Sequence, residues 1–402
     1  MCAKLNIQTY NFKGKKVLVR VDYNVPLNEE FEIQDTKRID ASIPTLIKIL
    51  GDGGSVILLS HLGRPQNKEY QFSLKHLVPY LNNVLGKEKI NVYFSPECIG
   101  AQARKYAESL REGEVLLLEN VRFYSEEESG DVDFAKELAS YGDVFVHEAF
   151  STAHRHHATT AVLPKFFPND KMYGFLMQEE INSLSRIMTN PRRPMTAVLG
   201  GSKVSSKIKI INNLMTKVDN VIIGGGMSFS FQKAMGGRIG KSLYEEDMLP
   251  IAKDVLEKAK ELNVNIYMSI DAVVADKFSN DARREIRKST DIPDDMAGVD
   301  IGLETCSLYR DILLKSATIL WNGPMGVFEM DNFSNGTFAI ADAIAKATEK
   351  GAFSVIGGGD TVSAINKFHL VDRYNYVSTA GGAMLEYCEG KELPGIAAME
   401  NE

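Results

Sequence analysis

The sequence has little cysteine and no long apolar run. Only four of its 402 residues are cysteines, at positions 2, 98, 306 and 388, and they form no C-x-x-C pair. This spacing argues against a zinc motif and against a disulfide framework, and it is typical of thiols in a reducing compartment. No apolar stretch approaches the roughly 18 residues of a membrane span. The opening residues lack the apolar core of a signal peptide, so we expect a cytoplasmic protein without a membrane partner.

The sequence also lacks an excess of positive charge. It has 46 Lys and Arg against 53 Asp and Glu, a net charge of −7. This balance argues against nucleic-acid binding through overall charge. Binding through a local basic patch is the alternative. Hydrophobic residues make up 44% and charged residues 25%, as in globular proteins. A chain of this length exceeds one ordinary core, so we expect two domains.

Short apolar runs rich in β-branched residues recur along the whole chain. Amphipathic patterns such as FAKELASYG (134–142) and IAKDVLEKAKEL (251–262) lie between many of them. This alternation is typical of parallel sheets with helices on both faces. It predicts an α/β fold with two doubly wound, Rossmann-like parallel-sheet domains joined by a helix and a hinge. The ten expected strands are KVLVRV (16–21), SVILLS (55–60), EVLLLE (114–119), DVFVHE (143–148), MTAVLG (195–200), NVIIGG (220–225), NVNIYM (263–268), ATILWN (317–322), FSVIGG (353–358) and YNYVST (374–379).

The best domain boundary lies near the middle of the chain. The stretch 164–174 is broken by prolines, and FLMQEEINSLSRIMTN then places Met177, Ile181, Leu184 and Met188 on one helical stripe. The segment PRRP stops this helix. We therefore expect an N-terminal domain over 1–174, a connecting helix over 175–190 and a C-terminal domain over 191–389.

Glycine turns follow four expected strands of the second half. They are VLGGSKVSSK (198–207), IIGGGMSF (222–229), VIGGGDTVS (355–363) and VSTAGGAML (377–385). Glycines let backbone N–H groups approach a ligand closely, and helix N-termini favour anions. In a parallel sheet these turns gather at one edge, so they predict a phosphate site. The fingerprints G-x-G-x-x-G and G-x-x-x-x-G-K-[ST] are absent, which weakens a dinucleotide or Walker A interpretation.

Charged residues accompany these turns. Lys203 and Lys207 would share one face of a helix, where a phosphate could lie between them, and a solvated surface pair is the alternative. Asp360 suits Mg²⁺, which takes one or two carboxylates plus phosphate oxygens, or it caps the next helix. In WNGPMGVFE (321–329), Asn322 and Glu329 could contact a sugar and a base edge, or the stretch could simply pack around Trp321.

Basic residues take the place of glycine turns in the first half. Several follow expected strand ends and should share one sheet edge, where guanidinium groups suit phosphate or carboxylate. Scattered surface arginines are the alternative. We expect neither a metal site at His154, His156 and His157 nor a catalytic role for His147. The candidates are Asp22 and Asn24 in RVDYNVPL, Arg38, His61 and Arg64 in SHLGRP, Arg122 in LLENVRF, and Arg155 in EAFSTAHRHHA.

A nucleotide-phosphate half and an arginine-rich anion half together indicate phosphoryl transfer, which needs positioning, metal and cations more than covalent chemistry. No catalytic base stands out, and a carboxylate acceptor needs none because it is already ionised at neutral pH. A nicotinamide dehydrogenase and a nucleotide sensor without catalysis are the alternatives. The first lacks its fingerprint, and the second would not need the cationic residues.

Seven motifs occur along the chain in a fixed order: RVDYNVPL, SHLGRP, LLENVRF, GGSKVSSK, GGGM, WNGPMGVFE and GGGDT. With these motifs the chain resembles the phosphoglycerate kinase family along nearly its whole length. The resemblance implies a glycolytic and gluconeogenic phosphotransferase with a carboxyl group as acceptor. Its reaction would be reversible transfer from 1,3-bisphosphoglycerate to Mg-ADP, giving 3-phosphoglycerate and ATP. It also implies a cytoplasmic monomer with hinge closure, whose tail (390–402) packs back on the first domain.

The resemblance further implies roles for residues. Asp360 would bind the Mg²⁺ that accompanies ADP or ATP. The phosphoglycerate would be held by Asp22, Asn24, Arg38, His61, Arg64, Arg122 and Arg155. The nucleotide would be held by Lys203, Lys207, Gly224, Gly225, Asn322, Pro324, Glu329, Gly358, Gly359, Asp360 and Thr361. The catalytic set would be Arg38, Lys203, Gly381 and Gly382.

The sequence departs from the family pattern at a few positions. Ala380 stands where a third glycine is customary, in a turn expected to face the transferring phosphoryl group, and this puts the turnover rate in question. The other departures are His147, Glu148, Ser151 and Leu303.

Overall fold

The computed structural model describes residues 5–400. Contacts between Cα atoms divide the chain into two compact units. Unit 1 contains the residues up to Ile181 together with those from Glu392 onward, and unit 2 contains Asn182–Lys391. The chain thus passes from unit 1 to unit 2 inside helix α6 (Phe175–Thr189) and returns between Lys391 and Glu392.

Unit 1 is built on a six-stranded sheet in which every neighbouring pair is parallel. The strand order is β3-β4-β2-β1-β5-β6, so the direction of winding reverses between β1 and β5. Ligands bind at such switch points, outside the carboxyl ends of the strands. The strands are β1 (Lys16–Val21), β2 (Ser55–Leu59), β3 (Val92–Phe94), β4 (Val115–Leu117), β5 (Val144–Glu148) and β6 (Lys171–Tyr173).

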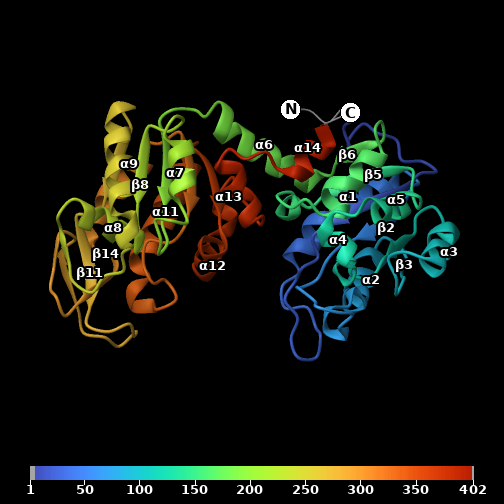
Figure 1. Cartoon of the computed structure of the whole chain (residues 1–402), viewed down its shortest axis with the longest axis horizontal. Coiled ribbons are helices and arrows are strands. Elements are labelled where there is room, and N and C mark those ends of the chain that lie inside the picture. Colours follow the sequence, from blue (N-terminus) through green and yellow to red (C-terminus); the bar gives the residue numbers. More distant parts are fainter. Residues whose placement is uncertain (1–4, 401–402) are drawn as a thin grey trace. The chain divides into compact units, whose positions relative to one another are not determined.

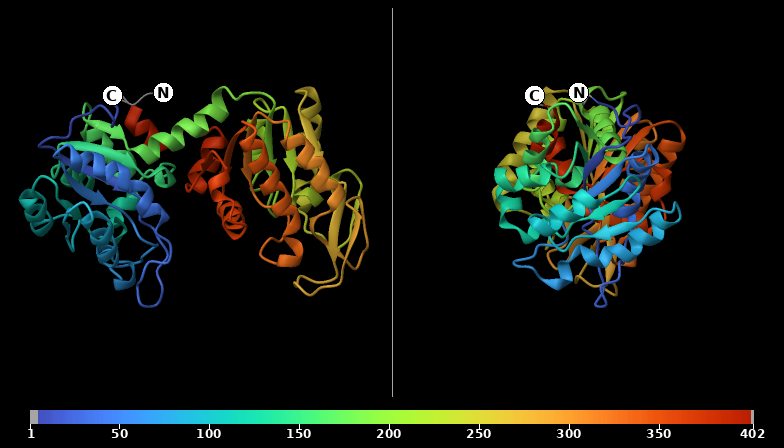
Figure 2. Two further views of the ribbon diagram at one scale, coloured as in Figure 1. Left: turned by 180° about the vertical axis from the view of Figure 1, so that it is seen from behind. Right: turned by 90° about the vertical axis from the view of Figure 1, so that its right-hand side faces the viewer.

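Helices cover both faces of this sheet (Figures 1 and 2). In α1, Ile39, Leu46 and Ile49 are fully buried, and they belong to the same core cluster as Val17 and Val19 of β1. Burial of this apolar stripe fixes α1 against the sheet. The helices of unit 1 are α1 (Lys37–Gly51), α2 (Val78–Gly86), α3 (Ala101–Ser109), α4 (Ser125–Ser129), α5 (Val132–Ala139) and α14 (Pro394–Glu400).

Unit 2 contains a second six-stranded parallel sheet, in the order β10-β8-β7-β15-β16-β17. Counted along this sheet, the order is 3-2-1-4-5-6, the arrangement of dinucleotide-binding folds, and it reverses between β7 and β15. The strands are β7 (Met195–Leu199), β8 (Asn220–Ile223), β10 (Asn265–Met268), β15 (Thr318–Asn322), β16 (Phe353–Gly357) and β17 (Tyr376–Val377). The helices are α7 (Ile208–Leu214), α8 (Met227–Ala234), α9 (Leu249–Glu261), α10 (Leu303–Leu313), α11 (Asn335–Glu349), α12 (Gly359–Lys367) and α13 (Gly382–Cys388).

Two small sheets extend unit 2. An antiparallel sheet joins β11 (Asp271–Ala275), β12 (Arg284–Lys288) and β14 (Ala297–Ile301), and β9 (Arg238–Ile239) pairs with β13 (Asp291–Ile292). None of these strands was predicted from the sequence; β12 reads REIRK and is almost entirely exposed, so it has no apolar pattern.

The predicted fold class is confirmed, since both sheets are parallel and doubly wound. All six strands of the second sheet coincide with expected runs, as do β1, β2, β4 and β5 of the first. The expected connecting helix is α6. The proposed domain limits stay a prediction. In the part of the chain described here, residues 5–400, no helix combines the length and the apolarity that crossing a membrane requires.

Candidate active site

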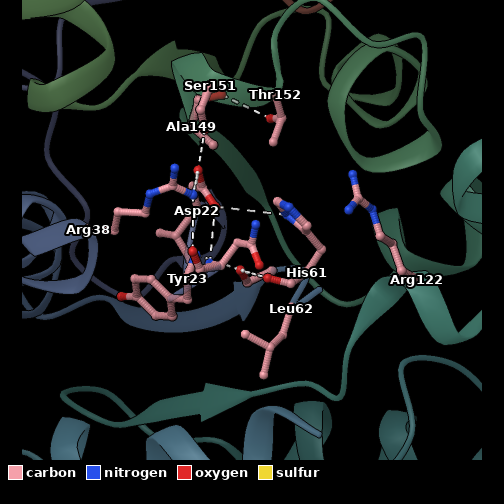
Figure 3. Close-up of polar contacts among 12 residues, drawn as sticks. Asp22, Tyr23, Arg38, His61, Leu62, Arg122, Ala149, Ser151 and Thr152 are labelled. Carbon is pink, nitrogen blue, oxygen red and sulfur yellow. Dashed lines mark hydrogen bonds and ion pairs between the residues drawn. The ribbon is translucent and has the colours of Figure 1, made fainter. Parts of the chain in front are cut away.

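Asp22 follows β1 directly and lies at the switch point of unit 1 (Figure 3). Its Oδ2 accepts hydrogen bonds from Arg38 Nη1, at 2.8 Å, and from the Ser151 hydroxyl. Its Oδ1 accepts one from the backbone N–H of Asn24, at 3.1 Å. Arg38, near the start of α1, also donates to the Asn24 carbonyl at 3.1 Å. Asp22 thus fixes the arginine, the loop after β1 and the loop after β5 at one place.

His61 lies beside Asp22, just after β2. Its Nδ1 is 4.0 Å from Asp22 Oδ1 and 3.3 Å from Arg20 Nη2. Burial, with the positive charges of Arg20, Arg122 and Arg38, lowers the pKa of His61 well below its usual value. The imidazole is therefore neutral. Its Nδ1 accepts from Arg20, because a guanidinium can only donate, and this leaves the proton on Nε2.

Arg20 is a site residue that the sequence reasoning missed. It lies inside β1 and is 1% exposed. Its Nε donates to the Thr159 hydroxyl at 2.8 Å, and that hydroxyl donates to the buried carboxylate of Glu127 at 2.6 Å. Burial lowers the pKa of Arg20, and the charges of Glu127 and Asp22 oppose this shift. An arginine within the apolar run KVLVRV was the available signal.

Arg122 brings a further cation to the same sheet edge. Its Nη1 donates to the Gly63 carbonyl at 2.7 Å, and its buried Nε donates no hydrogen bond within residues 5–400. Burial lowers its pKa, the charges of Arg20 and Arg155 lower it further, and the charges of Glu128 and Glu127 oppose this shift. Arg155 therefore lies near Arg122, whereas Arg64 is exposed in the loop after β2. Several arginines thus gather at this edge beside Asp22, Glu127 and Glu128, and their guanidinium groups suit an anion with more than one charge.

In unit 2, the loops after β7 and β15 meet backbone to backbone at the switch point. A Cβ atom at Gly200 would lie 2.1 Å from the Pro324 carbonyl oxygen, and one at Gly323 would lie 2.2 Å from the Gly200 carbonyl oxygen. No side chain fits at either position. Gly200 of GGSK and Gly323 of NGP are therefore required by this close approach.

A cavity of about 620 Å³ opens beside these loops. Glycine backbone and apolar side chains line most of it, as in pockets for organic ligands of this size. Leu243 and Phe278 are highly exposed at 63% and 69%, and no pattern in the sequence pointed to either of them. The loops that follow β7, β8, β15 and β16 all line the cavity. They contribute Gly201, Gly225, Pro324, Glu329 and Asp360.

Several candidates organise these loops. The Lys207 ammonium donates to Asn322 Oδ1, and Asn322 Nδ2 donates to the Gly357 carbonyl at 2.8 Å. The Thr361 hydroxyl accepts from the backbone N–H of Gly323 at 2.7 Å. Burial lowers the pKa of Lys207, and the charges of Asp360 and Glu389 oppose this shift. Gly358 has a φ of 94°, and a Cβ there would lie 2.5 Å from Asn322 Nδ2.

Two local expectations were wrong. Lys203 and Lys207 do not share a helix, because residues 202–207 are not helical and α7 begins at Ile208. The serines explain this, since Ser206 donates to the Lys203 carbonyl at 2.8 Å and so competes with helical hydrogen bonding. The alternative that Asp360 caps α12 is also wrong, because Gly358 is the N-cap residue and Asp360 lies exposed in the first turn.

The remaining candidates lie at loop positions. Gly224 approaches Met325, Gly359 begins α12, and Glu329 is exposed. Gly381 is the N-cap residue of α13 with a φ of 54°, and Gly382 begins that helix. The adjacent Ala380 is 4% exposed, so its methyl group is packed away.

Comparison with known proteins identifies the family. The phosphoglycerate kinase family model matches residues 7–391. The chain belongs to the phosphoglycerate kinase family. It is 49% identical to the phosphoglycerate kinase of Porphyromonas gingivalis, over 98% of this chain and all of that protein. It is 50% identical to the cytosolic phosphoglycerate kinase of Triticum aestivum, over 97% of this chain and 96% of that one.

Solved phosphoglycerate kinases have the same fold. The structure from Coxiella burnetii matches with a TM-score of 0.90 at 40% identity, and covers 98% of both chains. The structure from Pyrococcus horikoshii matches with a TM-score of 0.82 at 30% identity, again over 98% of both chains. This family membership confirms a kinase, a transferase of glycolysis, and excludes the dehydrogenase and the non-catalytic sensor.

Proposed function

We propose that this phosphoglycerate kinase transfers a phosphoryl group reversibly from 1,3-bisphosphoglycerate to Mg-ADP, giving 3-phosphoglycerate and ATP. The observation that carries the proposal is the set of cations near Asp22, in which Arg20, Arg38 and Arg122 lie with the neutral donor His61 at one sheet edge. Such a set matches a small ligand that carries both a phosphate and a carboxylate.

In unit 1, we assign phosphoglycerate binding to the residues at that edge. Arg38, Arg122 and Arg155 would pair with phosphate and carboxylate oxygens, because guanidinium groups bind both through paired N–H donors. His61 would donate from Nε2, since Nδ1 already accepts from Arg20. Asp22 and Asn24 would hold these donors and the loop in place, and Arg64 would approach from the exposed loop after β2.

In unit 2, we assign the nucleotide to the 620 Å³ cavity. The apolar end, with Leu243 and Phe278, would take the base, and Glu329 and Asn322 would lie near the sugar. The glycine turns with Lys203, Lys207 and Thr361 would take the phosphates through backbone N–H groups and ammonium groups.

The donor set fits a magnesium ion that arrives with the nucleotide. Within residues 5–400, no three His, Cys, Asp or Glu side chains gather into a metal-binding group. One exposed carboxylate, Asp360, lies at the start of α12 and next to Lys207, and Mg²⁺ is commonly held by one carboxylate together with phosphate oxygens. When bound, the ion would neutralise charge on the phosphate oxygens.

The transfer itself requires no general base. The bond between the phosphorus atom and the acyl oxygen of 1,3-bisphosphoglycerate breaks, and a bond forms to a terminal phosphate oxygen of ADP. The leaving carboxylate is stable as an anion at neutral pH, so no proton moves. Arg38, Lys203 and the N–H groups of Gly381 and Gly382 would stabilise the charge spread over the transferring group.

We further propose that the enzyme is a cytoplasmic monomer that closes about a hinge. The two ligand sites belong to different units, and reacting atoms must come within about 3–3.5 Å while water is excluded. The name of the wheat relative, a cytosolic enzyme, supports the location. Small-angle scattering should give a smaller radius of gyration with both substrates than with either alone. Equal radii in all states would contradict hinge closure, and a dimer in sedimentation would contradict the monomer.

A coupled assay tests the reaction. We expect formation of 1,3-bisphosphoglycerate that depends on both 3-phosphoglycerate and Mg-ATP and stops when the metal is chelated. The same preparation with Arg38→Ala serves as the control for contaminating activity. Lack of turnover by the unchanged chain in both directions would overturn the proposal.

A further inference from the structure

Glu148, the last residue of β5, ties the start of α6 to unit 1. The carboxylate is 1% exposed. Its Oε1 accepts from the backbone N–H of Leu176 and its Oε2 from that of Met177, both at 3.1 Å. These N–H groups lie in the first turn of α6, where a helix has no internal acceptors for them.

Thr45 completes this attachment from α1. Its hydroxyl donates to Glu148 Oε1 and accepts from the backbone N–H of Phe175 at 2.9 Å. The first three N–H groups of α6 are therefore bound by β5 and α1. These are the elements that present Ser151 and Arg38 to Asp22, so the start of α6 and the anion site share their supports.

Among the described residues, 5–400, no cation pairs with Glu148 to compensate its charge. Burial raises its pKa to about 7, and the opposing influences are hydrogen bonds from Thr45, Met177 and Leu176. The positive end of α6 is its compensating charge. A Cβ at Gly174 would lie 2.1 Å from Glu148 Oε2, so the chain passes over the carboxylate without room for a side chain.

The second half of α6 is attached to unit 2. The Arg186 guanidinium lies 3.9 Å from the ring centre of Phe353, the first residue of β16. Arg192, just beyond the helix, donates to the Gly351 carbonyl. Strand β16 leads to Gly358 and Asp360. The first half of α6 is thus fixed to the end of β5 that leads to Ser151, and the second half is fixed to the start of β16, whose other end leads to Gly358 and Asp360.

We propose that Glu148 is a positioning residue for phosphoryl transfer, because it sets the direction in which α6 leaves the anion site toward unit 2. The inference rests on the proposed function. With 15 residues, α6 is about 22 Å long at about 1.5 Å per residue. A tilt of about 5° at its start therefore moves its far end by about 2 Å. Such a shift separates reacting atoms without altering either binding site.

Replacement of Glu148 by glutamine tests this. The amide group would place a donor against an N–H of α6, so one of the two bonds must break. We expect Glu148→Gln to lower kcat about tenfold, with KM for 3-phosphoglycerate and for ATP changed less than about twofold. The contraction in small-angle scattering on addition of both substrates should also shrink. Glu148→Asp, which restores the charge, should recover part of kcat.

Asp271 in unit 2 provides a matched control. Its carboxylate is also buried and accepts from the backbone N–H groups of Glu304 and Thr305 and from the Thr305 hydroxyl, the same donor set, at the start of α10. Helix α10 does not connect the units. Asp271→Asn should lower the melting temperature as Glu148→Gln does, while its kcat stays within about twofold.

The outcomes separate the possibilities. If Glu148→Gln loses stability but keeps kcat and the full contraction, Glu148 is only a helix cap and the proposal is overturned. If Glu148→Gln does not fold, Thr45→Val, which removes one donor and one acceptor of the same attachment, decides between the same two results. Lack of turnover by the unchanged chain would count against the proposed function instead. In that case the difference in contraction between the unchanged chain and Glu148→Gln still tests the positioning role of Glu148.

Discussion

Arg38 Nη1 lies 2.8 Å from Asp22 Oδ2, and the acid is the more buried partner, with side chains 34% and 9% exposed. The pair joins α1 to the end of β1. Because Asp22 also holds Ser151 and Asn24, the guanidinium is oriented before any ligand arrives. Such preorganisation is what a group that stabilises a transition state requires.

Replacement of Arg38 should therefore affect turnover most. We expect Arg38→Ala to lower kcat by about 10²–10³-fold, as when one preorganised donor is removed. The KM for ATP should barely change, since Arg38 belongs to unit 1. Arg104→Ala, which removes an arginine on α3 that pairs with Glu137, should leave kinetics unchanged. A rise confined to the KM for 3-phosphoglycerate would show simple binding by Arg38 instead.

Loss of the Asp360 charge should weaken the metal-nucleotide complex. We expect Asp360→Asn to raise the apparent KM for Mg-ATP and lower kcat, because one of the oxygen ligands loses its charge. Stability should change little, since Asp360 is exposed and is not the N-cap residue. Asp372→Asn, another exposed aspartate of unit 2, is the control. Steady-state kinetics at several Mg²⁺ concentrations would refute the role if both variants behave alike.

Asp300 should make stability depend on pH. Burial raises its pKa to about 7, and hydrogen bonds from Gly336 and Ile301 oppose this. The folded state therefore holds the proton more tightly than the unfolded chain. The contribution of Asp300 to the free energy of unfolding falls as pH rises from about 4 to about 7, and is constant above that.

The measurement is a difference between two proteins, because buried histidines act in the opposite direction. Burial lowers the pKa of His147 to about 3 and that of His157 to about 4, so they favour folding as pH rises toward about 6.5. Urea unfolding of the unchanged chain and of Asp300→Asn cancels these terms. The advantage of aspartate should shrink by about 3 kcal/mol between pH 5 and pH 8. Parallel curves would contradict the assignment.

Ala380→Gly tests the departure in the late loop. The methyl group is buried, and the Ala380 N–H donates to the Ser378 hydroxyl at 3.2 Å. Glycine adds conformational freedom to the unfolded chain, so we expect a loss of about 0.5–1 kcal/mol of stability. We expect kcat to change by less than about tenfold. A larger rise would show that the methyl group hinders the phosphoryl group.

The sequence predicted what local pattern determines. The six strands of the large sheet in unit 2 were all recognisable as short apolar runs, most of them ending in glycine turns. Strands β3 and β6 were missed, because each has only three residues and, unlike the equally short β4, neither lies in a continuous run such as VLLL. The exposed, charged β12 has no apolar pattern at all, since its pairing with β11 alone makes it a strand.

For the candidate sites, too, the sequence revealed the residues that follow a local pattern and missed those that are brought in by distant segments. The motif residues of unit 1 follow strand ends, so topology alone gathers them. Arg20 was missed because an arginine inside a buried strand acquires its partners, Thr159 and His61, from distant segments. Leu243 and Phe278 likewise reach the cavity from separate loops. The segment 202–207 is not helical but was predicted as helix, because lysine spacing alone does not reveal the serine hydrogen bonds there.

The C-terminal segment has a consequence for biosynthesis. The Gly395 N–H donates to the Ala153 carbonyl at 2.8 Å, and Lys171 donates to the Ala398 carbonyl at 2.9 Å, so α14 is part of unit 1. A ribosome therefore delivers unit 2 as one uninterrupted piece, whereas unit 1 waits for a segment made after the whole of unit 2. During translation unit 2 can reach its native structure first, and unit 1, although begun earlier, is the last to be completed.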